Sequence, residues 1–508
     1  KNGTLWFATY YGGINNFNPK DFITYSTSEG LLSNQILSIN QTSTNNRIIA
    51  GTFDGVSTFE LNSGAIKNIK NYTTQQGLPH NRTFSIFKDN HNFVWLGTKK
   101  GISITNDFKK FQLITDLSCD IENEIYTIVQ ENNNTYWAGG EDGLFQITFS
   151  SFPKKYIVLQ YPNEKIPSTD ISTLAKDSDN NIWIGYRHDG VRIKKNNGGG
   201  FITPNFSKSI INISTIVIKD DNVWIGTDTK GLFHFKNNNI EDTIDVMQYS
   251  TANGLSSNNV YSLAIKRDNE IWIGSEKGVD KVLLNESLEI ESIDQFGKDE
   301  GISGGEIIEK STFITSSNDL LFGTVKGLVS SSFLTSNSHP SPPKITLLKF
   351  ESFSKDKDTK ENHLDNLNNI EIEYSSNNIA LDFIGINLSN PNKVKYKWFL
   401  EGYSKSWSTP TSRSFLTFTN LTNKEYKLKL LSSSGNDQWN KTPYILQFRI
   451  KTPFWKSFWF ILLLVVSFIF FIYAGVKWKI NQLIKKQEFL ENEIQKATQT
   501  IKEEKKLI

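Results

Sequence analysis

The chain of 508 residues is too long for one ordinary hydrophobic core, so its length indicates several domains. Its 55 basic residues balance 53 acidic ones, and a net charge of +2 gives no sign of direct nucleic-acid binding. The single cysteine, Cys119, excludes a disulfide framework and a cysteine-rich metal site. The chain starts at Lys1 inside a repeat and shows no signal peptide, and we expect it to lack its natural start.

A short unit, tryptophan followed by an apolar residue and glycine, recurs through the first 335 residues. It reads "VWLG" at 94–97, "IWIG" at 182–185 and "VWIG" at 223–226. Each unit has an anchor two residues before its glycine, or before Ala8 in the first unit, and the anchors are Trp6, Ile49, Trp95, Trp137, Trp183, Trp224, Trp272 and Leu321. Short alternating runs on both sides predict four strands for every 41 to 49 residues, which is the period of a β-propeller blade. We expect the tryptophans to pack blade against blade.

The order of the units predicts seven blades within residues 19–337. We expect "DFITYST" (21–27) to be the outer strand of the last blade, and to close the ring by pairing with the blade of Leu321. The seven blades then run from Ile49 to Leu321. Residues 1–18 are left over, and we expect them to be the remnant of a preceding propeller.

Clusters of aspartate and asparagine, such as "KDSDNN" (176–181), separate the first and second strands. We interpret them as tight turns, because these residues bond their own backbone in turns and no cluster has the spacing of a calcium-binding EF-hand. The six histidines are scattered without zinc spacing. We therefore predict no metal site, no cofactor and no catalytic residue in this chain.

The loops between the second and third strands vary while their flanks repeat, as loops that carry function do. "YRHD" (186–189) is longer than most of them and combines an aromatic ring, a guanidinium and an imidazole. The predicted ligand contacts on this rim are Tyr186, Arg187, His188, Phe53, Lys99, Lys100 and Asp228. Such a set can stack on a sugar ring and bond its hydroxyls, or hold a uronate carboxylate by two hydrogen bonds. For any one loop, a solvated turn is the alternative.

The repeat stops near "SHPSPPKI" (338–345). Residues 338–452 hold about seven short alternating runs, which predict a β-sandwich. Residues 457–476 are then uncharged and mostly apolar, and as a helix they span about 30 Å, the thickness of a bilayer core. We predict one transmembrane helix there, with a buried helix of a soluble domain as the alternative. Equal numbers of Lys and Arg on the two flanks leave its orientation open.

Residues 477–508 alternate apolar steps of three and four, which predicts a parallel coiled coil and a homodimer. The predicted seam consists of Ile480, Leu483, Leu490, Ile494, Ala497 and Ile501. An amphipathic helix lying on the membrane surface is the alternative.

The repeats resemble the two-component regulator propeller family, on units such as "QGLPHNRTFSI" (76–86) and "NGLSSNNVYSL" (253–263). The second module resembles the three-tyrosine (Y-Y-Y) domain that follows such propellers, and it is Ig-like. Its matching residues are Tyr396, Leu400, Gly402, Trp407, Leu421, Tyr426 and Trp439. Phe418 stands where that family usually shows its middle tyrosine.

This resemblance implies the extracytoplasmic and transmembrane part of a sensor histidine kinase, of the hybrid kind, in a two-component phosphorelay. It implies a single-pass protein of the inner membrane, with the propeller and sandwich in the periplasm and the final helix in the cytoplasm. The expected partners are a second copy, an extracellular small ligand such as an oligosaccharide, and a downstream response regulator or output domain.

No histidine follows His363 and no ATP-binding box is present, so the kinase domains would lie outside these residues. Two alternatives stay open. The same sensor can drive a DNA-binding or cyclase domain, or the chain can be a membrane-anchored propeller enzyme. The enzyme would need paired carboxylates on one face, and the repeats show no such pair at matched positions.

Overall fold

The computed structural model describes residues 5–9, 13–17, 22–42, 46–62, 64–115, 123–161, 170–196, 198, 200–237, 246–331, 342–354, 360–362, 370–387, 391–434 and 439–504. The chain divides into two compact units, Lys1–Pro340 and Ser341–Ile508.

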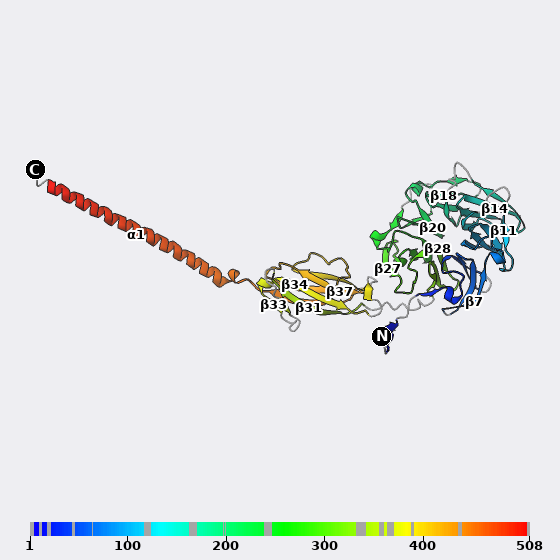
Figure 1. Ribbon diagram of the computed structural model, residues 1–508. Helices are drawn as coiled ribbons and strands as arrows, with labels where there is room; N and C mark the ends of the chain where they lie inside the picture. The colour runs from blue at the N-terminus through cyan, green and yellow to red at the C-terminus, as the bar shows by residue number, and fades with distance from the viewer. Residues whose placement is uncertain are drawn as a thin grey trace. The chain divides into compact units, whose positions relative to one another are not determined.

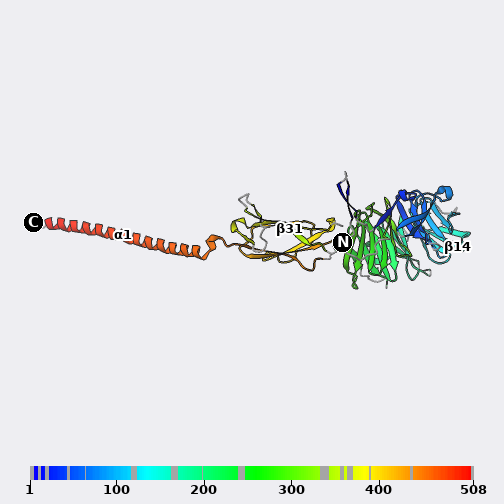
Figure 2. The same ribbon diagram turned by 90° about the horizontal axis from the view of Figure 1, so that it is seen from below.

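Seven antiparallel sheets of four strands form the first unit and surround a common axis (Figure 1). Figure 2 shows the same ring from its edge. From the innermost strand outwards, blade one consists of β4 (Ile36–Gln41), β5 (Ile48–Thr52), β6 (Val56–Asn62) and β7 (Ala65–Tyr72), blade two of β8 (Thr83–Lys88), β9 (Val94–Thr98), β10 (Gly101–Thr105) and β11 (Gln112–Ile114), and blade three of β12 (Ile125–Gln130), β13 (Thr135–Gly140), β14 (Gly143–Ser151) and β15 (Lys155–Gln160). Blade four consists of β16 (Ile171–Lys176), β17 (Ile182–Tyr186), β18 (Val191–Lys194) and β19 (Phe201–Ile202), and blade five of β20 (Ile213–Lys219), β21 (Asn222–Thr227), β22 (Leu232–Lys236) and β23 (Met247–Tyr249). Blade six consists of β24 (Ser262–Arg267), β25 (Glu270–Ser275), β26 (Gly278–Leu284) and β27 (Ile290–Phe296), and blade seven of β28 (Ile307–Ile314), β29 (Leu320–Thr324), β30 (Gly327–Ser330) and β3 (Ile23–Tyr25). The predicted seven-bladed propeller is confirmed.

The ring closes through strand β3, the first strand of the propeller in the sequence, as the repeat order predicts. β3 pairs antiparallel with β30, with Thr24 opposite Val329. Phe22, just before β3, is buried, and its ring meets those of Phe296 and Trp272 at 5.2 and 6.3 Å. Upstream, β1 (Leu5–Thr9) and β2 (Gly13–Phe17) pair with each other and with no other strand among the described residues. That residues 1–18 are the remnant of another propeller stays a prediction.

The five anchor tryptophans of blades two to six are only 0–2% exposed and lie in the cores between neighbouring blades. Aspartate turns hold two of them, Trp183 and Trp95, in place. Asp177 accepts the backbone N–H groups of Asp179 and Asn181 with one oxygen, and the indole N–H of Trp183 at 3.0 Å with the other. Asp89 does the same for Trp95. The interpretation of these clusters as turns is confirmed at both sites.

The glycine after each anchor lets one blade approach the next. A β-carbon added at Gly185 would lie 2.7 Å from a methyl group of Thr173 and 2.8 Å from one of Ile213, which belongs to the next blade. The glycine turns before blades two and six are 3-10 helices, η2 (Thr74–Gln76) and η4 (Thr251–Asn253), and η1 (Thr27–Glu29) precedes blade one. A further one, η3 (Asn205–Lys208), precedes blade five.

The second unit begins with a sandwich of two four-stranded sheets, which confirms the predicted β-sandwich. One sheet has the order β32 (Lys360–Asn362), β31 (Ile345–Phe353), β34 (Asn378–Gly385) and β36 (Phe415–Phe418). The other has the order β33 (Ile370–Ile372), β38 (Tyr444–Ile450), β37 (Glu425–Ser433) and β35 (Lys395–Glu401), and η6 (Tyr374–Ser376) and η7 (Pro391–Lys393) lie in the connections. Tyr396, Phe418 and Tyr426 are buried in the common core.

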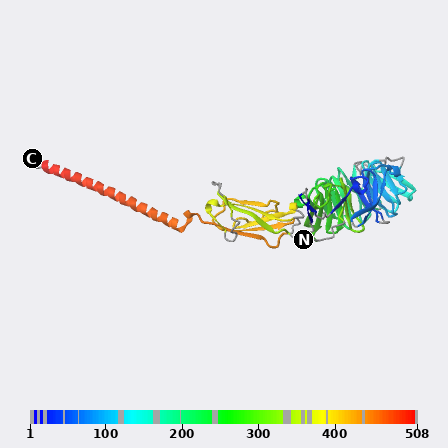
Figure 3. The same ribbon diagram turned by 60° about the horizontal axis from the view of Figure 1, so that its bottom comes forward.

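A single helix, α1 (Phe458–Glu504), follows the sandwich after the short η8 (Phe454–Lys456). Figure 3 shows it as one unbroken ribbon. It is long and apolar enough to cross a membrane, and its most apolar window is not buried against the rest of the described chain. Trp455 meets Tyr374 of the sandwich edge to face, with ring centroids 5.7 Å apart. The predicted transmembrane segment and seam are therefore parts of one helix.

Candidate ligand-binding site

Single-residue β-bulges interrupt the inner strands of blades one to five at the same end of the propeller, because the pairing with the second strand skips one residue in each. In blades four and five the skipped residue is a buried serine, Ser172 or Ser214, and in blades one to three it is a larger residue, Leu37 in β4, Phe84 in β8 and Tyr126 in β12. A bulge re-aims its extra side chain and is common beside functional sites. The three larger side chains line one cavity beside the inner strands, which we call the central pocket.

Blade seven carries a longer bulge at the matching place. Residues 308–311 of β28 lie opposite a single residue of β29, Gly323. Lys310 takes the left-handed backbone conformation there, with φ of 57°, and such strain is typical of functional sites. Its ammonium group donates to the carbonyl oxygens of Tyr126 at 3.3 Å and Ser172 at 2.5 Å. The bulge thus ties blade seven to blades three and four.

The central pocket has a volume of about 600 Å³. Its aromatic lining residues are Phe84, Tyr126 and Tyr261, and its acidic ones are Glu124, Asp228, Glu306 and Glu309. Its basic lining residues are Arg82, Arg187 and Lys310. Seven of its twelve lining residues are therefore charged, which is more than the few polar groups typical of a site for a small apolar molecule.

Arg187 lies between two carboxylates, those of Glu309 and Asp170. Its two terminal nitrogens each donate to one oxygen of Glu309 at 3.0 Å, and its Nε lies 3.6 Å from Asp170. These hydrogen bonds raise the pKa of Arg187 and, against the effect of burial, lower the pKa of Glu309. The pair is a bidentate bridge from blade four to blade seven.

Burial is the main cause of shifted pKa values at Lys310 and Asp228 of the central pocket and at Asp170 beside Arg187. Burial lowers the pKa of Lys310 to about 8, although Glu309 opposes the shift. Burial also raises the pKa of Asp228, with Glu309 adding to the effect, and it raises the pKa of Asp170 against the pull of Arg187. Groups with shifted pKa values gather at functional sites more often than elsewhere.

The structure brings two of the seven predicted contacts, Arg187 and Asp228, into the central pocket. Two others touch its lining residues. Lys99 forms an ion pair with Glu124 at 3.2 Å, and Phe53 lies under the guanidinium of Arg82 at 3.6 Å.

The remaining three predicted contacts lie elsewhere. His188 and Lys100 are exposed and are not among the lining residues of the central pocket. Tyr186 is 0% exposed and packs in the core with Trp137 and Ile171, so its ring lies inside the blade and not on the rim. The alternation of β17 explains this, because Tyr186 continues the strand that buries Ile184.

Sequence reasoning missed Tyr126, Glu309 and Lys310, because it considered only the loops between second and third strands. A signal was present. The segment from the turn glycine to the serine of the inner strand is two residues longer in "GISGGEIIEKS" (301–311) than in "GLLSNQILS" (30–38). The repeat pattern also gave no sign that Glu306, Glu309 and Asp228 lie close together, because these carboxylates do not occupy matched positions in the repeat.

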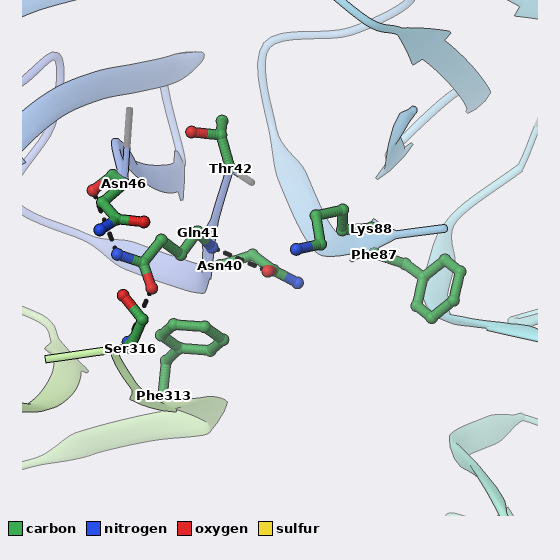
Figure 4. Close-up of a pocket in the computed structure, with 8 residues that line it drawn as sticks. All are labelled: Asn40, Gln41, Thr42, Asn46, Phe87, Lys88, Phe313 and Ser316. Atoms are coloured by element: carbon green, nitrogen blue, oxygen red, sulfur yellow. Dashed lines mark hydrogen bonds between the residues drawn. The ribbon is translucent and has the colours of Figure 1, made fainter. Parts of the chain in front are cut away.

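A second cavity of about 430 Å³ lies at the opposite ends of the inner strands (Figure 4). Its polar side chains bond one another. Gln41 accepts the backbone N–H of Ser316 at 2.8 Å and donates to the carbonyl oxygen of Asn46 at 3.1 Å, while Asn40 donates to Ile86. This network joins blade seven to blade one. Over the described ranges of the chain, no group of three His, Cys, Asp or Glu side chains is placed to hold a metal ion.

Comparison with known proteins matches both modules. Residues 387–451 match the Y_Y_Y domain family, and residues 165–188 and 254–277 match the two component regulator propeller family. The chain is 22% identical over 397 residues to Histidine kinase P4 of Formosa agariphila, across 72% of this chain and 28% of that protein.

Two solved structures from B. thetaiotaomicron share the fold. One is the extracellular domain of a hybrid two component system, with a TM-score of 0.73, 22% identity, and coverage of 88% of this chain and 60% of that one. The other, also from a hybrid system, has a TM-score of 0.53, 20% identity, and coverage of 89% and 62%. The chain thus spans less than two thirds of each of these three proteins. It carries regulator propeller repeats followed by a Y_Y_Y domain.

Proposed function

We propose that this chain, with regulator propeller repeats and a Y_Y_Y domain, is the ligand-sensing and membrane-crossing part of a two-component sensor histidine kinase. The observation that carries the proposal is the continuity of α1. One helix of 47 residues runs from the sandwich through an apolar stretch into the heptad positions, without a break. A rotation or shift at its start can therefore reach its end.

The signal in this proposal is a small extracellular molecule bound in the central pocket, for which an oligosaccharide is a fitting class. Aromatic rings and paired charges line this pocket, and it joins blades four, five and seven through Arg187, Asp228 and Glu309. A ligand there shifts the equilibrium between two arrangements only by the difference in its affinity for them.

The proposal places the propeller and sandwich outside the inner membrane and the end of α1 in the cytoplasm. Exposed aromatic residues at the start of the helix, Phe458 and Trp459, suit the interface between lipid and water. The seam residues that follow are also exposed, with Leu483 and Ile494 as examples. A second copy can cover them in a parallel coiled coil.

The test uses the complete receptor in cells, with transcription of its target genes as the readout. One to seven alanines are inserted after Lys479, between the apolar stretch and the seam. Each alanine rotates the following helix by about 100°, so the output should change with insert length and return near wild type at seven residues. If transcription does not change with insert length while the amount of receptor stays constant, signalling through α1 is contradicted.

A further inference from the structure

The cations of the central pocket already have partners. Both terminal nitrogens of Arg187 bond Glu309, and the ammonium of Lys310 bonds two backbone carbonyls. The guanidinium of Arg82 lies over the ring of Phe53, with its central carbon 3.6 Å from the ring centroid. Arg82 alone among the three has no carboxylate or carbonyl bonded to its side chain in the described part of the chain. Arg82 is therefore the one basic side chain of the lining that is available to bind a ligand carboxylate.

The anions of the same pocket have unused hydrogen-bonding capacity. One oxygen of Asp228 is buried without a hydrogen-bond partner among the described residues, and so is one oxygen of Asp170 behind Arg187. Glu306 is exposed at the mouth and makes no ion pair within the described ranges. The four acidic side chains of the lining outnumber its three basic ones. Acceptors are thus in excess, and a buried acceptor without a donor is unfavourable.

We infer that the central pocket takes an uncharged ligand that donates hydrogen bonds to Asp228 and Glu306, and that it rejects the carboxylate form of the same molecule. The inference rests on the proposed function, which puts the signal in this pocket. A hydroxyl group can fill the unused acceptors, whereas a carboxylate would lie beside Asp228, Glu306 and Glu309. Repulsion between like charges in one pocket disfavours binding of the carboxylate, and specificity often comes from this kind of repulsion.

The binding experiment uses the 508-residue chain in detergent and calorimetric titration. The probes are matched pairs that differ only at one carbon, such as glucose and glucuronate, or galactose and galacturonate, together with their short oligomers. We expect at least one neutral member to bind, and at least tenfold more tightly than its uronate. A uronate that binds as well as its neutral partner, and loses binding in Arg82→Gln, overturns the inference but keeps the pocket as a ligand site.

Two variants test the charge argument directly. Glu309→Gln releases Arg187 from its bridge. In this variant we expect the ratio of the Kd of the uronate to the Kd of its neutral partner to fall at least tenfold. Asp228→Asn should weaken neutral binding several-fold and reduce the rejection of uronate. Asp54→Asn is the control, because it removes a carboxylate from the corresponding loop of blade one and is not a lining residue.

The outcomes separate the two proposals. An unchanged preference in Glu309→Gln and Asp228→Asn, with melting temperatures near wild type, overturns the charge argument alone. Neutral binding that persists in both variants and in Tyr126→Ala shows that the ligand lies outside the central pocket. If no member of any pair binds, the inference and the sugar class of the signal both fail, while signalling through α1 is still judged by the alanine insertions.

Discussion

The propeller and helix α1 differ in how far their large apolar side chains are exposed. The propeller buries its anchor tryptophans to 0–2% exposure within the chain, while most large apolar side chains of α1 are 41–75% exposed. The propeller therefore finds its core in its own residues. In our proposal, lipid surrounds the first half of the helix and a second copy covers its second half. The difference predicts which changes act on folding and which act on assembly.

The largest effect is expected where assembly depends on the seam. Leu490→Lys with Ile494→Lys removes four apolar side chains from a dimer and puts like charges opposite one another. We expect association to weaken by about 5 kcal/mol, from the burial of half-exposed Leu and Ile side chains. Cross-linking and energy transfer between labelled chains in lipid nanodiscs measure this.

The control keeps the added charge and changes only the helix face. Asn492→Lys with Gln495→Lys places two lysines on the side of α1 away from the seam. This pair should dimerise like the wild type. Equal dimerisation in both double variants would contradict the coiled coil and favour the alternative, an amphipathic helix that lies on the membrane surface.

A smaller effect, on folding, is expected from an anchor tryptophan. Trp183→Ala empties a fully buried site and removes one partner of Asp177. We expect a loss of about 4 kcal/mol in the stability of the propeller, with dimerisation through α1 unchanged. Denaturant unfolding followed by near-ultraviolet circular dichroism measures it. Trp407→Ala, at a site 40% exposed in the sandwich, should cost far less, and a comparable loss there would contradict the burial argument.

Ring closure gives the next prediction. Phe22→Ala removes the ring that packs on Phe296 and Trp272, and we expect a loss of about 3 kcal/mol. Because β3 completes blade seven, backbone hydrogen exchange should speed up first in β28 to β30. Phe399→Ala in the sandwich is the control and should leave exchange in the propeller unchanged. Uniform acceleration over all seven blades would contradict local opening at the closure.

Repetition explains what could be predicted from the sequence. Trp183 and Gly185 have counterparts in phase along the repeats, so blade number and ring closure followed from spacing alone. The central pocket depends instead on the departures from the repeat. Lys310 lies in an inserted bulge, and its partners Tyr126 and Ser172 are 184 and 138 residues away. No periodic pattern encodes such contacts, and Arg187 was found only because its loop is also irregular.

The smallest effect concerns that bulge and depends on pH. The pKa of Lys310 falls from 10.5 to about 8 in the folded chain, mainly through burial, with Glu309, Asp170 and Asp228 opposing and Arg187 assisting the shift. Between these values the unfolded chain binds more protons than the folded one, so stability should rise with pH. We expect a gain of about 2 kcal/mol on going from pH 7.5 to 9.5. Lys310→Met should abolish this slope, although its baseline stability falls because the carbonyls of Tyr126 and Ser172 lose their donor. Thermal melting at both pH values compares the two chains, and parallel slopes would show that Lys310 keeps an ordinary pKa in the bulge.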